Sequence, residues 1–166
     1  MTNQDFMKAE LAGRLKVIYK CQMNEPDSIV VSLPLKYHYD LQWRHSTGTR
    51  DYIEVKNRNC KSTTYPDIMF NVEKVDHNME FGSHFFYVAT YTDNKAIWFQ
   101  PTEMPKSGIT YEEKWIKKTF IDPNSPKEKQ KRMFLNLNDV YKVEDLPNIT
   151  ITEKDDQWRN NTSGEW

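Results

Sequence analysis

The chain has 166 residues, of which 37% are hydrophobic and 13% aromatic, and its formal net charge is −1. This length suits one domain with a proper core rather than two. The near-neutral charge excludes a protein that coats nucleic acid by bulk charge alone, and the short apolar runs exclude a transmembrane helix.

The N-terminal residues and the cysteines indicate in which cellular compartment the protein is expected. The first ten residues carry polar groups and acids where a signal peptide needs positive charge followed by an apolar run. Cys21 and Cys60 are the only cysteines, and their spacing fits neither a disulfide framework nor a zinc knuckle. Together these features predict a cytoplasmic protein with no membrane partner.

Residues 3–23 are predicted to form a helix. Thr2 is a suitable N-cap, and Asp5 follows three residues later, close to a capping box. Apolar side chains then recur at spacings of three and four residues, at Met7, Leu11, Leu15 and Ile18. Glu10 lies beside this apolar stripe. A short strand over 28–33 follows the helix and ends at Pro34.

Residues 36–58 are predicted to form two strands folded about Gly48. Because residues i and i+2 of a strand share a face, Glu54 and Lys56 are neighbours on one face of the second strand. Ile53 and Val55 point the other way, into an apolar layer. On the first strand, one face carries His38, Asp40, Gln42 and Arg44.

The loop length decides whether the two acids meet. A three-residue loop at 47–49 would place Asp40 opposite Lys56 and Gln42 opposite Glu54, on the same side of the sheet. A longer loop centred on Gly48 keeps that pairing, whereas a two-residue loop would separate the acids. The odd-length loop is the prediction.

The rest of the chain completes an α+β (α/β) domain. Residues 68–71 are either a brief extended piece or the entry to a helix near 72–81, and strands are predicted over 85–92 and 95–100. The order αβββαββ predicts a central mixed sheet of about five strands flanked by helices. Residues 101–132 are polar and interrupted by prolines, whereas residues 133–137 and 140–143 look extended. We predict a single domain over 1–150, followed by a polar tail over 151–166.

Two acids and a lysine on one sheet face suit phosphodiester hydrolysis. Mg²⁺ or Mn²⁺ is bound by one or two carboxylates while keeping several waters, and Asp40 and Glu54 are suitable ligands. The backbone carbonyl of Val55 is a further candidate ligand. Lys56 would orient or deprotonate the attacking water and stabilise charge on the phosphate.

The pattern Asp40, thirteen intervening residues, then Glu54-Val55-Lys56 resembles the PD-(D/E)xK nuclease superfamily, as does the order of elements over about 4–100. The resemblance implies a restriction-endonuclease-like fold and a Mg²⁺-dependent endonuclease acting on DNA. It also implies an accessory acid from the first helix, for which Glu10 is the candidate. Gln42 is a possible accessory residue because the predicted register places it opposite Glu54. Tyr39 stands where the superfamily usually has proline.

Several alternatives stay open. Glu-x-Lys is a common pattern, and a second copy occurs at 112–114. The three residues would otherwise form a cross-strand charge group on a solvated sheet face, or the site would be degenerate in a domain that only binds nucleic acid or protein. Arg58 and Lys61 are candidate contacts to DNA phosphates, as is the basic run 127–132. The oligomeric state is left open, a homodimer included.

Overall fold

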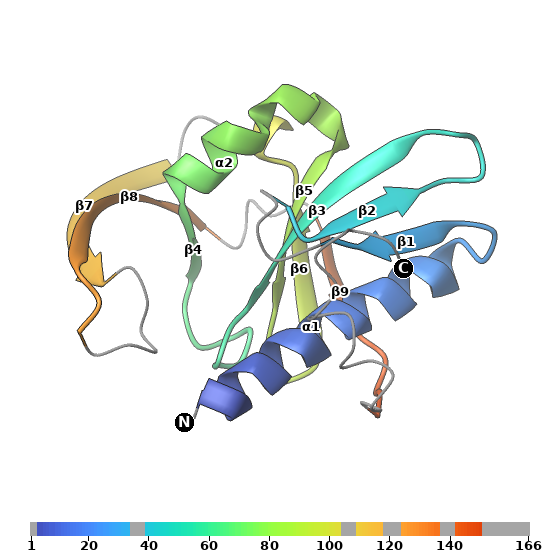
Figure 1. Cartoon of the computed structure of the whole chain (residues 1–166), viewed down its shortest axis with the longest axis horizontal. Coiled ribbons are helices and arrows are strands. Elements are labelled where there is room, and N and C mark those ends of the chain that lie inside the picture. Colours follow the sequence, from blue (N-terminus) through green and yellow to red (C-terminus); the bar gives the residue numbers. More distant parts are fainter. Residues whose placement is uncertain (1–2, 34–38, 104–108, 118–123, 137–141, 151–166) are drawn as a thin grey trace.

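The structure is a computed structural model that describes residues 3–33, 39–103, 109–117, 124–136 and 142–150. A six-stranded sheet lies at the centre, with the long helix α1 across one of its faces (Figure 1). A three-stranded sheet and the short helix α2 lie against the other side. The predicted α+β class is confirmed. Among the described helices, none has the length and apolar character that a membrane crossing requires.

Helix α1 (Asn3–Asn24) confirms the first predicted helix. Leu11 and Leu15 of the predicted stripe are buried, and Val17 and Cys21 extend the buried face. Gly13 lets the helix approach the sheet closely, because a Cβ atom there would lie 2.9 Å from the Thr90 hydroxyl oxygen.

The larger sheet has the strand order β1-β2-β3-β5-β6-β9. Its strands are β1 (Ile29–Ser32), β2 (Leu41–Arg44), β3 (Arg50–Asn57), β5 (Phe85–Thr90), β6 (Lys95–Phe99) and β9 (Lys142–Asp145). Neighbours pair antiparallel except β3 and β5, which are parallel. A parallel pair needs a crossover connection, and the chain between these strands supplies it. The sheet is mixed, as predicted, with six strands instead of about five.

The crossover holds β4 (Asp67–Asn71), α2 (Val72–Asn78) and the 3₁₀ helix η1 (Met79–His84). The helix predicted near 72–81 is therefore divided between an α-helix and a 3₁₀ helix. Of the two options left open for residues 68–71, the extended one is confirmed. A second 3₁₀ helix, η2 (Pro101–Glu103), follows β6.

The smaller sheet has the order β4-β8-β7 and corrects the prediction for 101–132. That polar region contains β7 (Ile109–Lys117) and the first half of β8 (Lys127–Asn136). Most of their side chains are exposed or half-buried, so the apolar alternation that identifies a strand is missing. Only the end of β8, at Met133 and Leu135, is buried. The predicted tail 151–166 lies outside the described residues.

The larger sheet separates two apolar cores. Ile53 and Val55 of β3 join the core beneath α1. Residues Ile97 and Phe99 of β6 join the core shared with the smaller sheet, which is rich in aromatic side chains. Because successive residues of a strand alternate faces, Glu54 is directed to the second side, away from its neighbours Ile53 and Val55.

Candidate functional site

The β2–β3 hairpin has a register two residues away from the predicted one. Leu41 pairs with Ile53, and Gln42 pairs with Tyr52 rather than Glu54. The prediction that Asp40 lies opposite Lys56 is also wrong, because Asp40 lies just before Leu41 and is bonded to Ile53. The shift is an even number of residues, so each side chain keeps its predicted side of the sheet.

The longer loop has identifiable causes. Residues 45–49 form it, closed by the His45 N–H donating to the Thr49 carbonyl (2.9 Å) and the Gly48 N–H to the His45 carbonyl (3.0 Å). Gly48 has φ +91°, a left-handed conformation that favours glycine. The His45 ring lies between two carboxylates: Nδ1 is 2.6 Å from Glu25, and Nε2 is 2.6 Å from Asp51. These contacts hold the turn and thereby set the register of the site.

Asp40 is bonded to β3 on both sides of Glu54. The Asp40 N–H donates to the Ile53 carbonyl at 2.8 Å, and its Oδ2 accepts from the Val55 N–H at 2.8 Å. Both acids are nearly enclosed, with exposed fractions of 8% for Asp40 and 4% for Glu54. The hydrogen bonds place Asp40 beside the backbone of β3 on both sides of Glu54.

Arg14 of α1 is part of the same site, although it was not among the site residues predicted from the sequence. Its Nη2 lies 2.7 Å from Oδ1 of Asp40 and 3.2 Å from Oε1 of Glu10, while Arg14 itself is only 4% exposed. The signal was present, because an arginine that falls between Leu11 and Leu15 lies near the buried stripe of the helix. A buried cation requires a buried anion, and Asp40 is that anion.

The pKa of the Tyr87 hydroxyl depends on the charged residues of this region. Tyr87 pairs with Glu54 across β3 and β5, and it is buried. Burial raises the pKa of the Tyr87 hydroxyl; the positive charge of Arg58 opposes this, while the negative charges of Glu54 and Asp40 add to it. The negative charges of both acids therefore act on a side chain of the core that is shared with the smaller sheet.

The remaining predicted residues lie around the acids with different roles. Lys56 is exposed, two residues beyond Glu54 on the same face of β3. Gln42 is buried, and its Oε1 accepts from Arg44 Nε at 2.7 Å. Arg58 donates to the Met69 carbonyl and so ties β3 to β4, whereas Lys61 is exposed in the following loop. Of these two predicted phosphate contacts, Arg58 is half-buried and Lys61 is exposed.

The donor set at Asp40 and Glu54 fits a magnesium ion that keeps several waters. Oδ1 of Asp40 lies beside Arg14 and Oδ2 accepts from the Val55 N–H, so a metal ion would share these oxygens with the arginine and the backbone. The N–H and C=O of a strand residue point to the same edge, so the Val55 carbonyl is on the side of Asp40. No cluster of three or more acids, histidines or cysteines with metal-binding geometry occurs in the described ranges.

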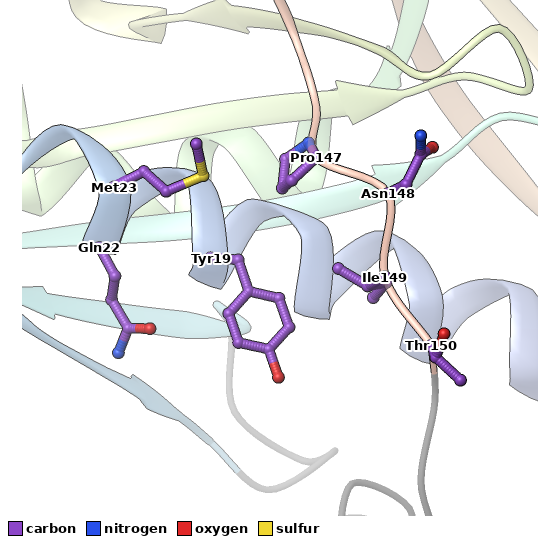
Figure 2. A pocket seen from close by; sticks show the side chains of 7 residues that line it. All are labelled: Tyr19, Gln22, Met23, Pro147, Asn148, Ile149 and Thr150. Atoms are coloured by element: carbon purple, nitrogen blue, oxygen red, sulfur yellow. The ribbon is translucent and has the colours of Figure 1, made fainter.

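A separate hollow lies away from the acids, between α1 and residues 147–150 (Figure 2). It encloses about 510 Å³ and is lined by Tyr19, Gln22, Met23, Pro147, Asn148, Ile149 and Thr150. Its lining is amide, apolar and hydroxyl, and it contains no carboxylate or lysine. This hollow therefore lacks the acid and base groups that hydrolysis requires.

Comparison with known proteins adds no family to this description. No protein-family model matches the chain, and a search of curated proteins found no match. The functional proposal therefore depends on the geometry of Asp40, Glu54 and Lys56.

Proposed function

We propose that this chain is a Mg²⁺-dependent endonuclease of the restriction-endonuclease-like fold that hydrolyses phosphodiester bonds of DNA. One observation carries the proposal: Asp40 is hydrogen-bonded to the residues immediately before and after Glu54, at 2.8 Å each, so two buried acidic residues are neighbours on one sheet. The helix, three-strand meander, crossover helix and parallel strand support the fold.

The chain's residues divide the chemistry among them. Asp40, Glu54 and the Val55 carbonyl would hold the ion, which supplies Lewis-acid activation of water and shields negative charge on phosphorus. Lys56 extends to solvent on the Glu54 face, where its ammonium group would meet the scissile phosphate and orient the attacking water. Arg14 holds Asp40 in place from the helix side.

A second function is favoured by the same arginine. The guanidinium of Arg14 already lies 2.7 Å from Asp40 and supplies a positive charge beside the acids. A domain of this fold that binds nucleic acid or protein without cleaving would retain such a pair as a structural element. This alternative predicts DNA binding in EDTA that survives substitution of both acids.

The deciding experiment measures cleavage and metal binding on the same variants. Supercoiled, linear and single-stranded DNA are incubated with Mg²⁺ or Mn²⁺, and Mn²⁺ binding is followed by calorimetry. Asp40→Asn and Glu54→Gln should abolish both activities, whereas Glu73→Gln, on the exposed surface of α2, serves as the matched control. If every DNA form stays intact and both variants bind Mn²⁺ as the wild type does, the proposed hydrolysis is wrong.

A further inference from the structure

β7 presents a long edge to its surroundings. It is the outer strand of the order β4-β8-β7, so β8 occupies one of its edges. Within the part of the chain that the structure describes, no strand pairs with its other edge. Figure 1 shows β7 and β8 at the periphery, away from the larger sheet. An edge of nine residues offers a row of backbone donors and acceptors to another strand.

The ribbon of β7 and β8 continues beyond the support of β4. β4 pairs with β8 over residues 132–136, whereas β7 pairs with β8 over 127–135. Large aromatic side chains are exposed along β7: Trp115, on this extension, is 63% exposed, and Tyr111, opposite Met133 where β4 still supports β8, is 55% exposed. Two such side chains on one face of an edge strand are typical of a surface that associates.

The sequence of β7 is nearly symmetrical about Glu113, reading Tyr-Glu-Glu-Lys-Trp over residues 111–115. If two copies of β7 pair antiparallel with Glu113 at the two-fold axis, Glu112 lies opposite the partner's Lys114. Tyr111 then lies opposite the partner's Trp115. Facing residues share a side of the sheet, so the pairing produces two opposite-charge pairs on one side and two aromatic pairs on the other.

From this complementarity we propose that the free edge of β7 binds a second copy of the chain. The two β7 strands would pair antiparallel and join the smaller sheets of both copies into one six-stranded sheet. Such an isologous contact closes on itself and leaves neither β7 edge exposed. The proposal is independent of the hydrolysis proposed above.

The two Glu113 side chains at the axis are compensated within each copy. Lys129 Nζ lies 2.9 Å from Oε2 of Glu113. Lys131 lies with its Nζ 5.0 Å from the centre of the Tyr111 ring, on the same face. Each copy therefore brings two lysines and one glutamate to the axis, so the like charges of the glutamates do not oppose the pairing. Lysine ammonium groups over the paired rings would also make cation–π contacts.

Charge reversal tests the register directly. Glu112→Lys would place lysine opposite the partner's Lys114, and Lys114→Glu would place glutamate opposite the partner's Glu112. Association of each variant with itself should weaken about tenfold or more, as measured by sedimentation over a concentration series. The contact is one strand wide, so the wild type is expected to associate reversibly rather than permanently. Matched reversals at exposed positions of α1 and of the turn after it, Lys8→Glu and Asp27→Lys, should associate as the wild type does.

Mixing the two single variants gives the sharper result. A Glu112→Lys copy and a Lys114→Glu copy restore both opposite-charge pairs between them, so heterodimers should form where neither variant self-associates. The combined Glu112→Lys and Lys114→Glu variant should self-associate again, and circular dichroism confirms that each variant is folded. A wild type that stays monomeric throughout, or that gains mass only when DNA is added, would overturn the proposal. Equal association of all variants would overturn it too.

Discussion

Nη2 of Arg14 lies 2.7 Å from Oδ1 of Asp40, and both residues are buried. The contact joins the helix on one face of the sheet to the acid that directly precedes β2. Asp40 in turn is bonded to β3 through its N–H and its second carboxylate oxygen. The position of the candidate metal ligand therefore depends on the helix, the hairpin and β3 at once.

Replacing Arg14 should destabilise the fold. Arg14→Met keeps much of the side-chain volume but leaves Asp40 as an uncompensated buried charge, which costs about 3 kcal/mol of unfolding free energy. Urea denaturation measures the change, and the combined Arg14→Met and Asp40→Asn variant should recover part of the loss. An Arg14→Met protein as stable as the wild type would show that the pair is energetically unimportant.

The same variant tests whether a cation shares these carboxylates. Without the guanidinium, the acids are more negative, so Mg²⁺ should raise the urea midpoint of Arg14→Met more than that of the wild type. Ca²⁺ and high NaCl serve as controls for charge screening. An equal effect of Mg²⁺ on both proteins would place the ion elsewhere.

Substitution of Lys56 should reduce cleavage without reducing metal binding. Lys56 is exposed and two residues from Glu54, so Lys56→Gln is expected to keep the fold and the metal affinity. Cleavage should fall about 10²- to 10⁴-fold, the usual contribution of a positioned acid or base. Lys61→Gln, at another exposed lysine nearby, should change cleavage far less. Loss of Mn²⁺ binding in Lys56→Gln would assign the lysine a structural role instead.

Gly13 should resist substitution despite its place in a helix. Alanine normally stabilises a helix interior relative to glycine by about 1 kcal/mol. Here its Cβ would meet the Thr90 hydroxyl at 2.9 Å and the Asn57 side chain at 3.3 Å, forcing the helix outward. We expect Gly13→Ala to lose about 1 kcal/mol of unfolding free energy overall. The combined Gly13→Ala and Thr90→Ala variant, which removes the obstructing hydroxyl, should recover part of the loss, and a more stable single variant would contradict the close approach.

The sequence predicted the parts of the site that follow from strand alternation. Asp40 and Glu54 are neighbours because their residue numbers differ by an even number. The observed register differs from the predicted one by two residues, and an even shift keeps each residue on the same side of its strand. The loop itself could not be predicted, because its length is set by the contacts of His45 with Glu25 and Asp51, which come from different elements. Local turn preference at Gly48 was outweighed by these tertiary contacts.

Arg14 and β7 were missed for opposite reasons. Arg14 was not singled out, because a charged helix residue is usually exposed and its burial is explained only once Asp40 is placed beside it. β7 lacks apolar alternation because most of its side chains are exposed. Pairing with β8, rather than burial, makes it a strand. In both cases the missing information was the identity of a distant partner.

His45 should make stability depend on pH. Both ring nitrogens lie 2.6 Å from carboxylate oxygens, an arrangement that the doubly protonated imidazolium satisfies with two hydrogen bonds. Burial by itself lowers the pKa of the His45 ring, but the hydrogen bonds and charges of Glu25 and Asp51 outweigh it, so the pKa is raised overall. The folded protein therefore holds the proton more tightly than the unfolded chain does.

The sign of the effect follows from linkage. A raised pKa contributes stability that is fully present below the unfolded value of about 6.5 and is lost as pH rises through the folded pKa. The urea midpoint of the wild type should therefore fall between about pH 6 and about pH 8, and His45→Gln should lose most of that dependence. His84→Gln, which contacts Asp51 from η1, is the histidine control and should retain it. Because His45 holds the turn that sets the β2–β3 register, cleavage should decline with the same pH dependence, and an identical profile in His45→Gln would contradict this link.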